Sequence, residues 1–136
     1  MITRDLDAFL AFARDAAPAF GPATARAAFL VAPDGFALAE QSAQDNAYMA
    51  DAAAFDAARA SAQHRDLQRA ISAVLPTVCF AGDPATQDAL FPNNVFGTAA
   101  GRVVIGRMRH EVRQREAART DIRRFFAEVL ACEEID

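Results

Sequence analysis

The sequence contains no lysine, because all 14 of its basic residues are arginine. Without a lysine amine, the chain cannot form a Schiff base or use such an amine as a general base. Its cationic contacts must therefore come from guanidinium groups. The net charge of −4 at pH 7 argues against nucleic-acid binding as the main function.

Cysteine is scarce, since Cys79 and Cys132 are the only two thiols in the chain. The first residues lack the charged-then-apolar layout of a signal peptide, and no uninterrupted apolar run is long enough to span a bilayer. These features predict a cytoplasmic protein with free thiols and no membrane partner. No spacing of cysteine and histidine is typical of a zinc site, so we expect neither a metal nor a cofactor.

A chain of 136 residues, 53% of them hydrophobic, is expected to fold as one domain or as a piece of one. The first half predicts an amphipathic helix, a buried strand, a polar loop, a long helix and a second buried strand. These elements are expected at 4–17, 27–31, 37–48, 51–74 and 77–80. The β-α-β order favours parallel pairing of the two strands. Apolar spacing predicts the buried face of the long helix: Leu67, Ala70, Ile71, Val74 and Leu75.

Most of the functional prediction depends on the stretch 87–116. It predicts a strand that ends at Leu90-Phe91, a turn at Pro92–Asn94, and a hairpin made of 95–98 and 102–108. A final helix follows as far as Leu130, with one apolar stripe: Val112, Ile122, Phe125, Phe126, Val129 and Leu130. Amide side chains at a strand end, with arginines returning beside them, can hold a small polar ligand.

Four short segments, in the same order, resemble one known superfamily. The segment Asp88–Asn94 looks like the DA-F-PNN motif of amidinotransferase-like proteins, and 28–31, 45–48 and 108–116 fit the same pattern. The chain therefore resembles the guanidino-group-modifying superfamily, or pentein fold, which includes arginine deiminases. The resemblance implies the α/β class, as a partial pentein-like α/β propeller of roughly two of five modules, with mixed sheets and packing helices.

This resemblance implies that 1–136 form a single incomplete domain. Its expected parts are an N-terminal helix (1–22), a first β-α-β module (23–84), a hairpin-plus-helix module (85–131) and a tail (132–136). Such a piece would leave the strand near Phe80, or the strand at Val103–Ile105, beside an absent partner. We therefore expect a homo-oligomer formed through the incomplete sheet flank.

The resemblance also implies a substrate-binding set. Phe91 matches the aromatic residue that packs on the substrate, and Arg113 matches the arginine that meets the substrate's α-carboxylate. Asn94, beside Asn93, matches a position where arginine deiminases carry a carboxylate for the guanidinium. Because an amide cannot neutralise that charge, Asp88 is expected to supply negative charge from nearby. Arg113 is expected on the surface, where substitution changes stability little.

Catalytic residues are not assigned. Similar enzymes use a cysteine nucleophile near the C-terminus and a histidine from a later module. Here Cys79 is expected in the core, Cys132 has no assigned partner, and His64 and His110 are expected on the surface. The chain is therefore expected to be the N-terminal part of an amidinotransferase-like or arginine deiminase-related enzyme, inactive alone.

Two other interpretations stay open. The first is a non-enzymatic module of the same fold that binds a small guanidino or carboxylate ligand at the corner formed by Asn93, Asn94 and Arg113. The second is an unrelated α/β structural or oligomerisation domain.

Overall fold

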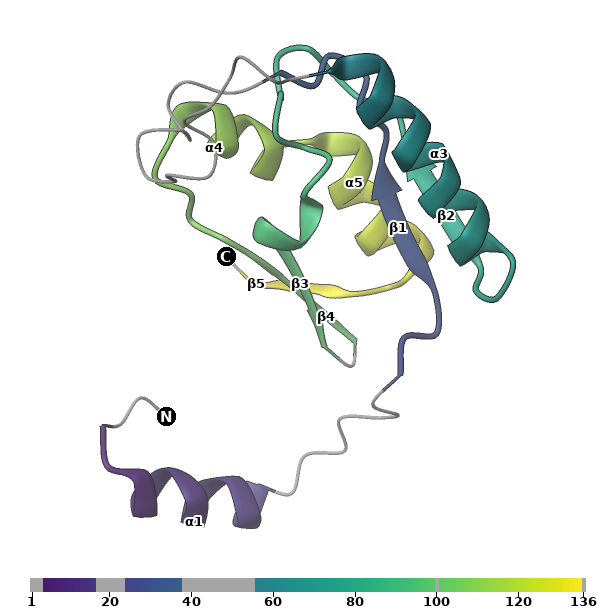
Figure 1. The fold of residues 1–136 in the computed structure, drawn as a ribbon. Coiled ribbons are helices and arrows are strands. Elements are labelled where there is room, and N and C mark those ends of the chain that lie inside the picture. Colours follow the sequence, from purple (N-terminus) through teal and green to yellow (C-terminus); the bar gives the residue numbers. More distant parts are fainter. Residues whose placement is uncertain (1–3, 17–23, 38–55, 100, 136) are drawn as a thin grey trace.

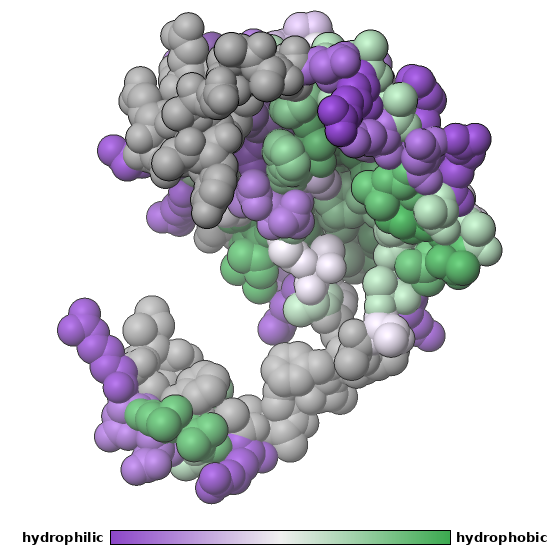
Figure 2. Space-filling model, viewed as in Figure 1, coloured by the Kyte–Doolittle hydropathy of each residue, from purple (hydrophilic) through white to green (hydrophobic). Residues whose placement is uncertain are grey.

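The computed structural model describes residues 4–16, 24–37, 56–99 and 101–135. The predicted first helix is confirmed as α1 (Leu6–Ala16), and the side chain of Asp5 accepts a hydrogen bond from the Ala8 amide at 3.0 Å. Its apolar side chains Leu6, Leu10 and Phe12 are exposed, and hydrophobic surface is visible over this helix in Figure 2. Among the described helices, none has the length and apolar character that crossing a bilayer requires.

The first sheet is built by a β-α-β unit, as predicted. Strands β1 (Ala28–Val31) and β2 (Thr77–Phe80) pair in parallel, and α3 (Ala57–Ser72) connects them (Figure 1). Asp56 caps α3 by accepting a hydrogen bond from the Arg59 amide at 2.9 Å. Residues 51–55 and the predicted polar loop 38–48 lie outside the described residues.

The predicted buried face of α3 is largely wrong. Leu67 is half exposed and Val74 is 78% exposed, whereas His64, expected on the surface, is only 8% exposed. The less exposed residues still follow three- and four-residue spacing, through Ala60, His64, Gln68, Ile71 and Leu75. Because this alanine-rich helix carries little apolar area on either side, its few large apolar residues do not decide which face packs.

The loops that follow β1 and β2 pack tightly against each other. A Cβ added to Gly82 would lie 2.5 Å from the backbone oxygens of Ala32 and Asp34. A Cβ added to Gly35, whose φ is +75°, would lie 2.5 Å from the Pro84 backbone. Glycine at these two positions therefore lets the two loops approach closely.

Gly82→Ala is expected to lower the free energy of unfolding by about 1–3 kcal/mol, because backbone atoms must shift to admit the methyl group. The matched control is Gly97→Ala, where an added Cβ meets nothing within 4 Å. We expect the control to leave stability within about 0.5 kcal/mol of the wild type. Urea denaturation of both variants checks this, and equal stability of the two would contradict the close packing.

The predicted strand ending at Leu90-Phe91 is wrong. The segment 84–91 instead forms successive turns, which lead into a 3₁₀ helix at Pro92–Asn94. Its amides bond locally: Ala89 to the Thr86 carbonyl at 3.0 Å and Phe91 to the Asp88 carbonyl at 3.0 Å. Because these amides are used within the turns, they are not available to a strand ladder.

The second sheet contains three strands. The predicted hairpin is confirmed as β3 (Phe96–Ala99) and β4 (Arg102–Ile105), which pair in antiparallel fashion. The expected tail 132–136 contains a strand, β5 (Glu133–Ile135), which pairs in parallel with β4. Strand β4 is therefore central, and the expectation that Val103–Ile105 lacks a partner is wrong, because the tail supplies one.

The predicted single final helix is divided into three pieces: α4 (Glu111–Ala117), α5 (Thr120–Arg124) and a π-helical turn (Phe125–Val129). It breaks at Arg119, whose ψ of 108° is not helical. The π turn bonds the Leu130 amide to the Phe125 carbonyl at 3.2 Å, five residues back. This wider turn changes the helical register, so that Val129 and Leu130 are exposed although the stripe before them is buried.

One apolar core joins the two sheets. Ile122 and Phe126 are fully buried between them, and the ring centroid of Phe126 lies 5.3 Å from that of Phe29 on β1 and 6.0 Å from that of Phe96 on β3. The described part of the chain is thus a mixed α/β fold with two sheets and no closed barrel. The division into modules at 84/85 stays a prediction.

Candidate functional site

The segment 88–94 contains four of the five residues that the sequence predicts to bind substrate. Phe91, Asn93 and Asn94 are all exposed, and the Phe91 ring meets Phe36 edge-on with centroids 6.1 Å apart. Asp88, in contrast, is buried. The segment therefore presents an aromatic ring and two amide side chains to solvent, above a buried carboxyl group.

Arg113 lies beneath this segment rather than on the surface, and the expected surface position is wrong. The residue is only 5% exposed. Its Nη1 donates to the Asp88 carbonyl at 2.8 Å and its Nη2 to the Phe91 carbonyl at 3.5 Å. The guanidinium is buried because it satisfies backbone oxygens that the successive turns leave pointing inward. Arg113 thus ties α4 to the segment 88–94.

Glu116 completes a buried charge cluster that the sequence reading did not find. It is 1% exposed, and its Oε2 lies 2.8 Å from Arg113 Nη1, while Asp88 Oδ2 lies 4.0 Å from the same nitrogen. Neither carboxyl oxygen of Glu116 makes an aligned hydrogen bond to a described residue. The cluster therefore places two carboxyl groups around one guanidinium. The i,i+3 spacing of Arg113 and Glu116 on one helix is the signal that could have predicted their contact.

The pKa of Glu116 is raised to about 7, mainly by burial; the Asp88 charge adds to the rise, and Arg113 and Arg119 oppose it. Desolvation is the dominant cause, because the carboxylate gives up water without gaining an aligned donor. Glu116 therefore changes its charge near neutral pH, within the structure that holds the segment 88–94.

The surroundings of Cys79 do not favour a thiolate. Burial raises the pKa of the Cys79 thiol, and the nearby Asp34 charge raises it further. A raised pKa keeps the thiol protonated, which is the less nucleophilic form. Cys132 is partly buried against the core, at the start of β5. Across the described ranges, no group of three or more His, Cys, Asp or Glu side chains is placed to hold a metal ion.

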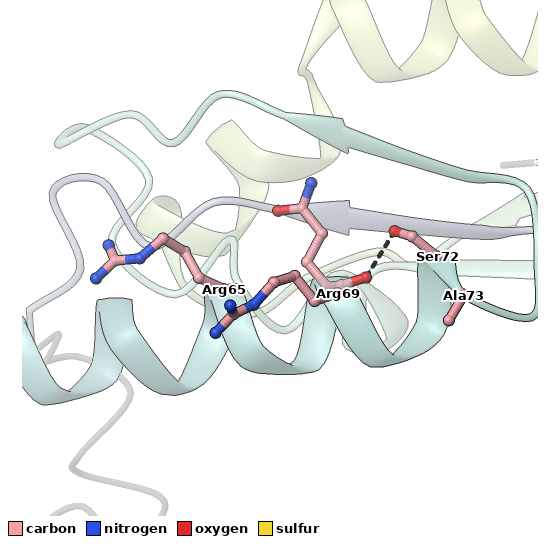
Figure 3. Close-up of a pocket in the computed structure, with 5 residues that line it drawn as sticks. Arg65, Arg69, Ser72 and Ala73 are labelled. Atoms are coloured by element: carbon pink, nitrogen blue, oxygen red, sulfur yellow. Dashed lines mark hydrogen bonds between the residues drawn. The ribbon is translucent and has the colours of Figure 1, made fainter.

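Several surface depressions, lined in part by arginine, lie outside the segment 88–94. One runs along α3 and is lined by Arg65, Gln68, Arg69, Ser72 and Ala73, with Ser72 Oγ donating to the Gln68 carbonyl at 2.6 Å (Figure 3). Another lies after β2, where Arg119 Nη2 donates to the Ala81 carbonyl at 2.9 Å and pairs with Asp121. Neither of these two depressions includes a residue of the expected substrate-binding set: Asp88, Phe91, Asn93, Asn94 and Arg113.

Comparison with known proteins identifies the family. The profile of the family described as N,N dimethylarginine dimethylhydrolase, eukaryotic, matches residues 32–135. Comparisons with curated proteins and with solved structures gave no match. The matched range includes α3, the segment 88–94, the Arg113–Glu116 pair and the whole second sheet. The chain therefore belongs to the N,N dimethylarginine dimethylhydrolase family, in agreement with its resemblance to guanidino-modifying proteins.

Proposed function

We propose that the chain supplies part of the substrate-binding site of a hydrolase that acts on a guanidino C–N bond. The family match supports the reaction class. The observation that carries the proposal is the segment 88–94, held by Arg113, in which Phe91, Asn93 and Asn94 face solvent and Asp88 lies beneath. The expected ligand is a small guanidino compound, such as arginine or a methylated arginine.

Each side chain of the expected substrate-binding set has a role in ligand binding under this proposal. The face of the Phe91 ring attracts a guanidinium through its π electrons. The amide oxygens of Asn93 and Asn94 accept hydrogen bonds from guanidinium N–H groups, and Asp88 adds negative charge at short range. Direct contact of Arg113 with a ligand carboxylate stays a prediction, and it requires the guanidinium to leave the Asp88 and Phe91 carbonyls.

Turnover is proposed to need residues beyond this sequence. Formation of a covalent intermediate on a guanidinium carbon requires a thiolate close to a proton shuttle. Cys79 has a raised pKa and a place in β2, so it does not meet that requirement. We propose that the chain is an N-terminal portion of the enzyme, roughly two of five propeller modules, and that it binds ligand without converting it. Amidinotransfer is retained as the alternative to hydrolysis.

Self-association through an open sheet edge is a second proposal. Within the described second sheet, β3 and β5 are the edge strands, and the outer side of β5 is exposed. Exposed Val129 and Leu130 lie just before β5 in the chain. An unpaired strand edge next to apolar side chains is a template for pairing with another copy. The rival function is that of an oligomerisation domain that binds no ligand. Titration calorimetry with a guanidino ligand separates the two functions, because only the ligand-binding function gives a binding signal.

The binding proposal is tested by titration calorimetry with dimethylarginine and with arginine, together with an assay for product release. We expect binding without turnover. Asn94→Asp is expected to tighten binding on the order of tenfold, because a carboxylate neutralises the guanidinium as an amide cannot.

The matched control for Asn94→Asp is Gln63→Glu, which makes the same kind of change at an exposed position on α3. This control is expected to leave affinity unchanged. The binding proposal is wrong if neither ligand binds, or if both variants change affinity equally. Turnover that disappears on substitution of Cys79 or Cys132 would overturn the proposal of an inactive portion.

A further inference from the structure

Arg113 makes long-range hydrogen bonds to the segment 88–94. The amides of Phe91 and Asn94 bond to carbonyls three residues earlier, inside the segment itself, and the Ala89 amide bonds to the Thr86 carbonyl just before it. Arg113, in contrast, reaches the Asp88 and Phe91 carbonyls across 25 and 22 residues of sequence. The position of the guanidinium therefore influences where the two ends of the Asp88–Phe91 turn lie relative to α4.

Glu116 contacts the same guanidinium. Its Oε2 is 2.8 Å from Arg113 Nη1, the same nitrogen that donates to the Asp88 carbonyl. The other charged groups that act on Glu116 are Asp88 from the segment 88–94 and Arg119 from the residue before α5. The negative charge of Glu116 thus acts on the side chain that holds the segment.

We propose that Glu116 is a positioning residue, which holds the Arg113 guanidinium against the Asp88 and Phe91 carbonyls and thereby keeps the segment 88–94 in its ligand-binding shape. This inference rests on the proposed function for its meaning, since the segment is the proposed ligand contact. Glu116 itself touches no ligand in the proposal, because it is fully buried below the segment.

The positioning effect of Glu116 is expected to become stronger as the pH rises. The pKa of Glu116 is raised to about 7. When the Arg113 guanidinium moves away, Glu116 loses a contact that favours its charged form, and its pKa rises further. Ionised Glu116 therefore favours the state in which Arg113 is held and the segment is ordered. Order in the segment is expected to increase between about pH 6 and pH 8.

The contribution of Glu116 to global stability changes with pH in the opposite direction. The pKa of Glu116 is higher in the folded protein than its usual value of 4.5. Its contribution to stability is therefore fully present below pH 4.5 and is lost as the pH rises through about 7. A role in general stability alone would make the segment less protected at pH 8, whereas positioning makes it more protected.

The experiment measures amide hydrogen exchange of the ligand-free protein at pH 6 and pH 8, corrected for the intrinsic pH dependence of exchange. Amides of β3 and β4 serve as the internal reference for global opening. In the wild type, protection of the amides of Ala89, Phe91 and Asn94 is expected to be about fivefold to tenfold higher at pH 8 than at pH 6, relative to that reference. In Glu116→Gln the protection is expected to be low at both pH values.

The matched control is Glu111→Gln, because Glu111 is an exposed glutamate on the same helix and pairs with Arg115 at 2.6 Å. It is expected to behave as the wild type does. Equal relative protection of the wild-type segment at the two pH values would overturn the inference, even if Glu116→Gln failed to fold. Failure to bind any guanidino ligand would contradict the proposed function instead, since the exchange measurement contains no ligand.

Discussion

Arg113→Met is expected to lower the free energy of unfolding by about 3–5 kcal/mol, because it leaves two buried carboxyl groups without their shared countercharge. Asp88 and Glu116 are both buried, and Arg113 also donates to two backbone carbonyls. From the sequence alone, Arg113 is predicted to lie on the surface, where its substitution would cause almost no loss. Urea denaturation at pH 7 measures the difference.

The control for this prediction is Arg115→Met, since Arg115 lies on the exposed side of α4 and pairs only with exposed Glu111 in the described contacts. We expect a loss within about 0.5 kcal/mol for it. Adding Glu116→Leu to Arg113→Met should recover part of the loss, because removing both partners of a buried pair costs less than removing one. A loss below about 1 kcal/mol for Arg113→Met would show that the buried cluster is not formed in solution.

Phe126→Ala is expected to lower the free energy of unfolding by about 3–5 kcal/mol and to lower the melting temperature of the whole protein. Phe126 is 1% exposed and its ring meets Phe29 from the first sheet and Phe96 from the second. Its loss therefore leaves a cavity in the core that joins the sheets. Circular dichroism and calorimetric melts are the measurements.

Val129→Ala serves as the control, because Val129 is exposed and lies in the same helical turn. It should change stability by less than about 0.5 kcal/mol. A single cooperative transition is expected for the wild type. Two separate transitions, only one of them shifted by Phe126→Ala, would mean that the modules on either side of 84/85 fold independently.

The elements that could be predicted from the sequence are those specified by local pattern. Strands β1 and β2 are short apolar runs between turn residues, and the β3–β4 hairpin has Gly101 at the positive φ of its turn. Such signals depend only on neighbouring residues. For the same reason the predicted turn at Pro92–Asn94 is confirmed, as a 3₁₀ helix, although the strand predicted before it is wrong.

The elements that could not be predicted depend on distant partners. Strand β5 is acidic and short, and its pairing with β4 is accompanied by ion pairs of Glu133 with Arg102 at 3.2 Å and of Glu134 with Arg123 from α5. The buried face of α3 is set by what packs on it, not by its own apolar residues. The turns at 88–91 are likewise supported by Arg113, which lies on another element.

The residues of the candidate site also divide into those whose exposure follows from the sequence and those whose burial depends on distant partners. Exposure of Phe91, Asn93 and Asn94 agrees with a ligand-contacting role, although that role itself stays a prediction. Burial of Asp88 and Arg113 could not be predicted from a charged stretch, because charged residues are usually solvated unless a partner is close. The contact of Glu116 with Arg113, in contrast, could be predicted from their i,i+3 spacing on one helix.

The central claim is that the segment 88–94 contacts a guanidino ligand, and an NMR titration with dimethylarginine tests it most directly. Backbone amide shifts are followed across the described elements, at millimolar ligand and pH 8. The account predicts saturable shifts concentrated at residues 88–96, with weaker changes in α4 transmitted through Arg113. Absence of shifts in this segment, or saturable shifts confined to the arginine-lined depression on α3, would contradict it.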